Sequence, residues 1–190
     1  MSEPKKLHRT ISIRVAYGWS GPMSKDRRWL GIRNFLKGVV KEAEARFRRR
    51  SGGQEPPPVE VRRLRAIAGD QIGRSIFKRI AETDVFVADI SHRTRKRQRE
   101  RTSNVLLELG AAMANDQSKV FILEDVKKGD PLDGIADLAG VLVSVLKADE
   151  ETEAAERTRL LNSDIGLRQR LVSVVAKLMT ERAAGPRLVA

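Results

Sequence analysis

Residues 84–91 read DVFVADIS, and this short run carries the clearest fold signal in the chain. Its apolar side chains follow one another without the alternation of a half-exposed strand, and polar residues flank the run on both sides. Continuous apolar strands are typical of parallel sheets that helices cover on both faces. The run therefore predicts an α/β fold in which this strand is central.

Strand-like and helix-like segments alternate on both sides of this strand. We predict further strands at residues 11–16, 59–64, 119–123 and 141–145, and helices at 25–48, 70–82, 103–115 and 153–182. Parallel neighbours need crossover connections, so these segments predict one five-stranded, mostly parallel sheet between helices. We assign residues 1–148 to one domain and 149–190 to a C-terminal helical extension packed on it, with Gly166 dividing the long helix into two pieces.

Composition narrows the class of protein. The 190 residues include no cysteine and two histidines, which excludes thiolate metal sites and cysteine nucleophiles and leaves carboxylates as the main chemical groups. No apolar run reaches the roughly 18 to 20 residues of a membrane span, so we expect a cytoplasmic protein. The net charge of +12 favours a polyanionic partner such as a nucleotide, a nucleic acid or an acidic surface. We expect no metal and no cofactor.

The candidate ligand site follows from the predicted sheet. Ligands of such sheets bind beyond the carboxyl ends of the strands, near the point where the strand order reverses. This rule selects Tyr17 and Gly18 after the first strand, Asp89 and Ser91 at the end of the central strand, and Asn104 at the start of the following helix. These residues are our predicted ligand contacts.

The helix after the central strand carries a second carboxylate. Its sequence is NVLLELGAAMA at residues 104–114, and Glu108 lies one helical turn after Asn104 on the same face. A carboxylate against an apolar wall binds its proton more tightly, which suits acid/base or nucleophilic work. A helical glutamate is more often a solvated surface group, however, and a strand-end aspartate such as Asp89 is often a cap or turn former.

The two runs DVFVADIS and NVLLELGAAMA together resemble the nucleoside 2-deoxyribosyltransferase-like and TIR-like superfamily. The resemblance extends from about Ile11 to Leu146, although only residues 84–114 are specific, and Thr83 stands where the family often has alanine. It implies a flavodoxin-like three-layer sandwich. It also implies enzymes that cleave or exchange N-glycosidic bonds in nucleosides, nucleotides or NAD, with some members acting as nucleotide-sensing or NAD-degrading antiviral effectors.

Transferred to this chain, the resemblance makes Glu108 the glutamate nucleophile and Asp89 its strand-end partner, and Tyr17 more weakly an aromatic residue that borders the pocket. A carboxylate beneath the anomeric carbon can trap an oxocarbenium-like sugar, while a second one assists proton transfer to the departing base. We therefore predict an N-glycosidase or deoxyribosyltransferase-like hydrolase, or an NADase, acting on a nucleotide or NAD-like molecule. Two alternatives stay open: a non-catalytic nucleotide-sensing module and a basic nucleic-acid-binding protein.

The basic segment at residues 93–101 departs from the family, whose corresponding turn is shorter and less basic. Charge blocks are usually solvated loops. Because this one leads into the helix that carries Glu108, we predict that Arg93 and Arg95 clamp phosphates of the ligand, and that the segment is a candidate contact for nucleic acid. The broad apolar side of the last helix is a candidate surface for a homo-oligomer.

Overall fold

The computed structural model describes residues 10–17, 26–64, 72–91, 93–95, 98–100, 103–125, 143–148 and 152–185. Five parallel strands form one sheet in the order β2-β1-β3-β6-β7. Their bounds are β1 Ile11–Tyr17, β2 Val59–Arg63, β3 Val85–Asp89, β6 Val120–Asp125 and β7 Val143–Leu146. The strand at residues 85–89 is buried throughout and lies at the centre, as the sequence predicts.

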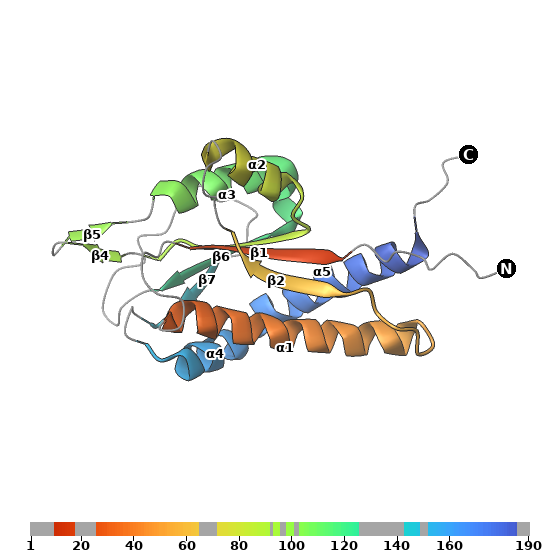
Figure 1. Ribbon diagram of the computed structural model, residues 1–190. Coiled ribbons are helices and arrows are strands. Elements are labelled where there is room, and N and C mark those ends of the chain that lie inside the picture. Colours follow the sequence, from red (N-terminus) through yellow and green to blue (C-terminus); the bar gives the residue numbers. More distant parts are fainter. Residues whose placement is uncertain are drawn as a thin grey trace.

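Helices cover both faces of this sheet (Figure 1). On one face lie α1 (Arg27–Arg50), α4 (Ala154–Ser163) and α5 (Ile165–Ala184), and on the other lie α2 (Ile72–Ala81) and α3 (Ser103–Asp116). A short 3-10 turn, Gln117–Lys119, links α3 to β6. The prediction of a three-layer, flavodoxin-like α/β sandwich with a long C-terminal helix is confirmed.

Alternation along the strands separates two apolar cores. In β3, Val85 and Val87 join the core under α1, α4 and α5, whereas Phe86 and Ala88 join the core under α2 and α3. Successive side chains of a strand point to opposite faces, so the parity of a position decides which helical layer it meets. The same alternation determines which residues at the strand ends lie on one face and can share a site.

The basic segment at residues 93–101 is not an irregular loop, although its high charge is typical of one. It contains two short antiparallel strands, β4 (Arg93–Arg95) and β5 (Gln98–Glu100), paired so that two residues connect them. The hairpin extends away from the layers, on the side where α1 and α3 begin (Figure 1). Its side chains lie outside the described structure, so nucleic-acid binding through this segment stays a prediction.

The C-terminal segment folds as two helices, and the break lies at Asp164. The carboxylate of Asp164 accepts hydrogen bonds from the backbone N of Leu167 at 2.9 Å and from Ser144 Oγ at 2.6 Å, and thereby caps α5. The apolar side of α5 is buried against α1 and the sheet. Most of this side is therefore not a free surface, which corrects our prediction of where copies of the chain would meet, while self-association itself stays a prediction.

Candidate functional site

The strand order reverses between β1 and β3, because the chain passes from β1 to β2 on one side and later returns to β3 on the other. The last residues of these strands, Tyr17 and Asp89, are neighbours in register. In sheets of this kind, the crevice beyond such a reversal is where ligands bind. The helices that follow β1 and β3 in the chain, α1 and α3, also begin at this edge (Figure 1). We therefore take the β1/β3 carboxyl edge as the candidate site.

On the α1 face of this edge, aromatic residues pack around a helix cap. Tyr17 donates a hydrogen bond from its hydroxyl to Asp26 at 2.5 Å, and Asp26 accepts another from the backbone N of Trp29 at 2.9 Å, so that it caps α1. The rings of Tyr17 and Trp29 are stacked, with centroids 6.2 Å apart. The guanidinium of Arg63 lies 4.5 Å from the Tyr17 ring. These contacts fix Tyr17 as a buried packing residue.

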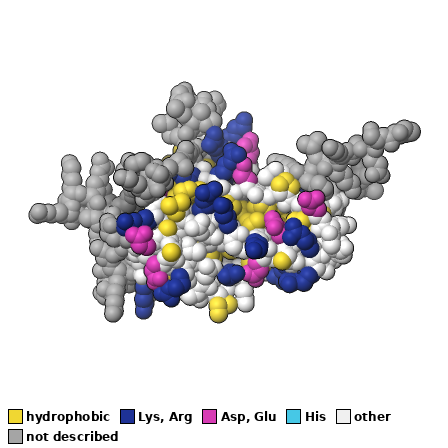
Figure 2. All heavy atoms as spheres, turned by 60° about the horizontal axis from the view of Figure 1, so that its bottom comes forward, with side chains coloured by type: hydrophobic (Ala, Val, Ile, Leu, Met, Phe, Trp, Pro, Cys, Tyr) yellow, Lys and Arg dark blue, Asp and Glu magenta, His cyan; other side chains and the backbone are white. Residues whose placement is uncertain are grey.

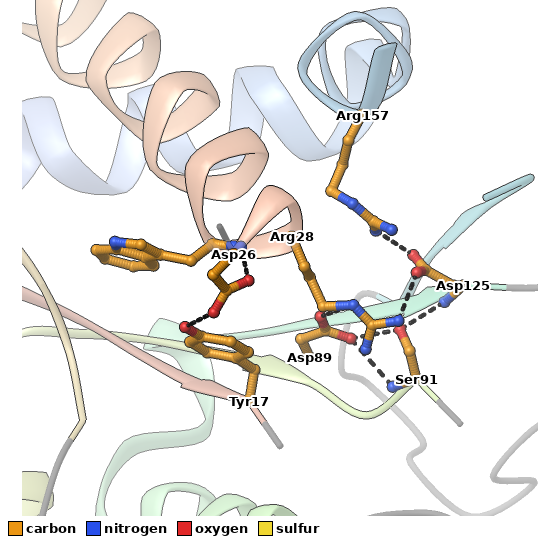
Figure 3. A network of polar contacts seen from close by, with 8 residues as sticks. Tyr17, Asp26, Arg28, Asp89, Ser91, Asp125 and Arg157 are labelled. Atoms are coloured by element: carbon orange, nitrogen blue, oxygen red, sulfur yellow. Dashed lines mark hydrogen bonds and ion pairs between the residues drawn. The ribbon is translucent and has the colours of Figure 1, made fainter. Parts of the chain in front are cut away.

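Beside it, a buried network of charges joins four elements (Figure 3). Arg28 of α1 lies 3.5 Å from Asp89 and 3.0 Å from Asp125 at the end of β6, and Arg157 of α4 lies 2.5 Å from Asp125. Ser91 donates its hydroxyl to Asp89 and accepts a hydrogen bond from the backbone N of Asp125 at 2.8 Å. Two arginines and two aspartates give the network no net charge.

The charged side chains of this network are buried and pair with one another, which indicates a structural role. All five side chains are buried, and burial together with the neighbouring Asp89 carboxylate raises the pKa of Asp125, against the effect of Arg157 and Arg28. Arg28 is paired with both aspartates. The α1 face of the edge is thus filled by groups that hold one another.

The opposite face of the same edge has a different character. At the corresponding positions of β1 and β3 stand two small residues, Ala16 and Ala88, which are neighbours in register and belong to the core under α3. Glu108 of α3 is 8 % exposed and, among the described residues, makes no hydrogen bond or ion pair. Burial raises the pKa of Glu108 to about 7.

The flank of α3 that carries Glu108 can be assigned from a second residue. Asn115 follows Glu108 by two helical turns and so lies on the same flank. Asn115 lines a cavity together with Ile80 of α2, which means that this flank faces α2. Glu108 therefore lies between α2 and α3, on the sheet face that carries Ala16 and Ala88.

Four of the predicted site residues can be placed with their side chains. Tyr17, Asp89 and Ser91 meet on the α1 face, whereas Glu108 belongs to the α3 face. Asn104 is the second residue of α3, and Arg93 and Arg95 lie in β4, but their side chains are outside the described structure. Gly18 also lies outside the described residues. Within those residues, no group of three or more His, Cys, Asp or Glu side chains is arranged to hold a metal ion.

No family model and no curated protein matches the chain. Among solved structures, it is similar to an oxidoreductase from Corynebacterium diphtheriae, with 13% identity, a TM-score of 0.45, and coverage of 92% of this chain and 98% of that one. It is also similar to FerB, a flavoenzyme NAD(P)H:(acceptor) oxidoreductase from Paracoccus denitrificans, with 13% identity, a TM-score of 0.36, and coverage of 88% and 97%.

The prediction of N-glycosidic cleavage is wrong. The predicted mechanism needs Glu108 and Asp89 on one ligand, yet β3 presents Asp89 to α1, while α3 and Glu108 lie across the sheet. Side chains on opposite faces of a sheet cannot act on the same bond.

Sequence reasoning missed the residues that complete the network. Asp125 ends a strand, which is the same signal that selects Asp89, and this signal could have found it. Arg157 gives no such signal, because its partner lies 32 positions away in the chain and only the packing of α4 on α1 brings them together. Gly31 is the one local hint, since its missing side chain makes room for Arg157.

Proposed function

We propose that this protein binds a nucleotide as a small-molecule ligand at the carboxyl edge of the sheet, between β1 and β3 on the α2/α3 face. The observation that carries the proposal is Glu108, a buried carboxylate that has no hydrogen-bond partner among the described residues and belongs to the helix that packs on the face of the two alanines. A buried charge without a partner is costly. A ligand that donates hydrogen bonds to Glu108 would remove that cost.

Two further features favour a nucleotide over other small molecules. Helix α3 begins at this edge on the same face (Figure 1), and a helix N-terminus stabilises phosphate through its free N–H groups and its dipole. The chain also carries a net charge of +12, which draws anions toward it. In this arrangement the ribose hydroxyls or the base donate to Glu108, while the phosphates lie toward the start of α3. The proposal concerns binding and includes no glycosidic cleavage.

The membership of the nucleoside 2-deoxyribosyltransferase-like and TIR-like superfamily is likewise a proposal. The pattern at residues 84–114 supports it, because the first run forms the central strand and the second forms the helix that follows the hairpin. Membership of this superfamily would mean common descent, and it implies no particular activity for this protein.

The test is equilibrium titration of the full chain with FMN, NAD⁺, NADP⁺ and AMP, a panel that contains redox and non-redox nucleotides. We expect saturable binding of at least one of them. Ionised Glu108 accepts hydrogen bonds, and with a pKa of about 7 its ionised fraction rises about tenfold between pH 6 and pH 8. Affinity should therefore increase by up to about tenfold over this range.

Two variants complete the test. Glu108→Gln should bind more weakly and lose the pH dependence, whereas Glu181→Gln, at an exposed position of α5 away from this edge, should bind as the natural chain does. Absence of saturable binding to all four nucleotides, or a pH dependence that survives Glu108→Gln, contradicts the proposal.

A further inference from the structure

A second site lies at the opposite, amino edge of the sheet. A cavity of about 320 Å³ opens there between the ends of α2 and α3 and the starts of β3 and β6. Most of its wall is polar, and its apolar part consists of the exposed Ala81 and four buried residues, Ile80, Phe86, Ala112 and Val120. This volume is at the lower end of the range for small-molecule sites, so the cavity suits a small metabolite.

Both oxygens of each aspartate on the cavity wall are already engaged by the protein. Asp84 accepts from Arg182 through one oxygen and from the backbone N of Ser12 at 2.9 Å through the other. Asp116 accepts from Lys119 at 2.8 Å through one oxygen and from the Ser118 hydroxyl at 2.6 Å through the other. Neither aspartate therefore has an uncommitted oxygen to offer a ligand.

The cations of these pairs, by contrast, keep unused donors. A guanidinium has five N–H donors and an ammonium has three. Among the described residues, Arg182 and Lys119 each engage one acid, Asp84 and Asp116 respectively. Both side chains line the cavity and are only partly exposed, so their remaining donors are available to an acceptor group of a ligand.

One acid on the rim is uncommitted. Glu82 is exposed, and its carboxylate has no hydrogen bond or ion pair among the described residues, although its backbone carbonyl accepts from Ser12 Oγ at 3.0 Å. Three carboxylates against two cations leave the wall with one negative charge, and the C-terminal ends of α2 and α3, which carry partial negative charge, also meet here. The resulting negative potential disfavours a ligand that is only an anion. The free donors of Arg182 and Lys119, however, favour a ligand with an anionic group.

A zwitterion satisfies both conditions. We propose that the amino-edge cavity binds a free α-amino acid with an apolar side chain. Its carboxylate accepts from Arg182 and Lys119, its ammonium pairs with Glu82, and its side chain lies on the apolar lining. The site is separate from the nucleotide site, since it occupies the other edge of the sheet.

The proposal is tested by amide NMR titration of the full chain with L-leucine, L-methionine and L-phenylalanine. We expect saturable shifts at Phe86, Ala112 and Val120 for at least one of them. The two halves of leucine, isopentylamine and isocaproate, each lack one charge and should bind at least about tenfold more weakly than leucine. Shifts confined to Ala16, Ala88 and Glu108 would belong to the carboxyl edge, so the two proposals can fail independently.

Variants at the exposed Glu82 and the partly exposed Lys119 test binding with little effect on the buried core. Glu82→Gln and Lys119→Gln should each weaken binding at least about fivefold, while Lys177→Gln, on α5 and outside the cavity lining, should leave it unchanged. The proposal is overturned if no amino acid binds saturably, if isocaproate binds as tightly as leucine, or if both cavity variants bind like the natural chain.

Discussion

At the scale of single residues, Arg157 is the clearest structural determinant. It is 1 % exposed and pairs with Asp125, so its removal leaves a buried carboxylate with Arg28 as its remaining arginine partner. Arg157→Met keeps the length of the side chain and should destabilise the fold by about 3 kcal/mol. Urea unfolding monitored by circular dichroism measures this.

Arg159→Met is the matched control, because Arg159 lies two residues further along α4 and pairs with Glu156 at the surface. An exposed ion pair of this kind contributes little to stability, so this variant should unfold at nearly the same urea concentration as the natural chain. Equal losses in the two variants would show that the buried network does not hold the fold together.

Glu108 gives a second prediction at this scale, this time with pH. Because the pKa of Glu108 is raised to about 7, the folded state binds more protons than the unfolded state at pH values between the ordinary glutamate pKa and about 7. The free energy of unfolding therefore decreases as pH rises through this window. Glu108→Gln removes the penalty and should stabilise the protein at pH 8 by up to about 3 kcal/mol, with little effect at pH 4.5.

Denaturant unfolding at the two pH values measures this effect, with Glu181→Gln as a control whose exposed carboxylate should change stability little at either pH. A stabilisation by Glu108→Gln that is the same at both pH values would mean that the burial of Glu108 is not the cause.

At the scale of the elements, the packing of α1 on α4 depends on a glycine. A Cβ added at Gly31 would lie 2.8 Å from Cβ and Cδ of Arg157, which its ion pair with Asp125 holds in place. Gly31→Ala should therefore destabilise the protein by about 1 to 3 kcal/mol. The change in thermal melting temperature measures it.

Gly38 provides the control within the same helix, because nothing lies within 4 Å of a Cβ added there. Gly38→Ala should stabilise the protein by about 0.5 to 1 kcal/mol, through helix propensity alone. Destabilisation by both substitutions, or by neither, would argue against close contact between α1 and Arg157.

The sequence predicts the elements better than it predicts their contacts. The central strand and the helix at residues 103–116 follow from local patterns, namely an apolar run and a helical spacing. The side of the sheet that Asp89 faces could not be predicted, because a strand buried on both faces shows no alternation that marks the α1 side. The sequence-based prediction therefore placed Asp89 and Glu108 in one site, although they lie on opposite faces of the sheet.

At the scale of the whole molecule, no helix within the described ranges combines the length and apolarity that crossing a bilayer requires. The face formed by α1, α4 and α5 shows basic side chains beside acidic ones rather than a continuous basic surface (Figure 2). Ion pairs such as Arg168 with Glu42 and Arg159 with Glu156 account for this mixture. This face is consequently a poor candidate for contact with a polyanion.

The division of the chain into a domain at residues 1–148 and a C-terminal extension is testable. Helices α4 and α5 supply much of one apolar core, including Leu161, Leu171 and Val175, as well as Arg157. A chain that ends at residue 148 should therefore fail to fold cooperatively. Thermal circular dichroism of this truncated chain measures it, and a sharp melting transition would instead show that residues 1–148 fold alone.

The central claim is that a nucleotide occupies the α2/α3 face of the β1/β3 edge. Amide NMR spectra of the full chain, titrated with the nucleotide that binds most tightly, test it most directly. We predict saturable shifts centred on Ala16, Ala88 and Glu108. Shifts absent from these three residues, or centred at the amino edge around Phe86 and Val120, would contradict the claim.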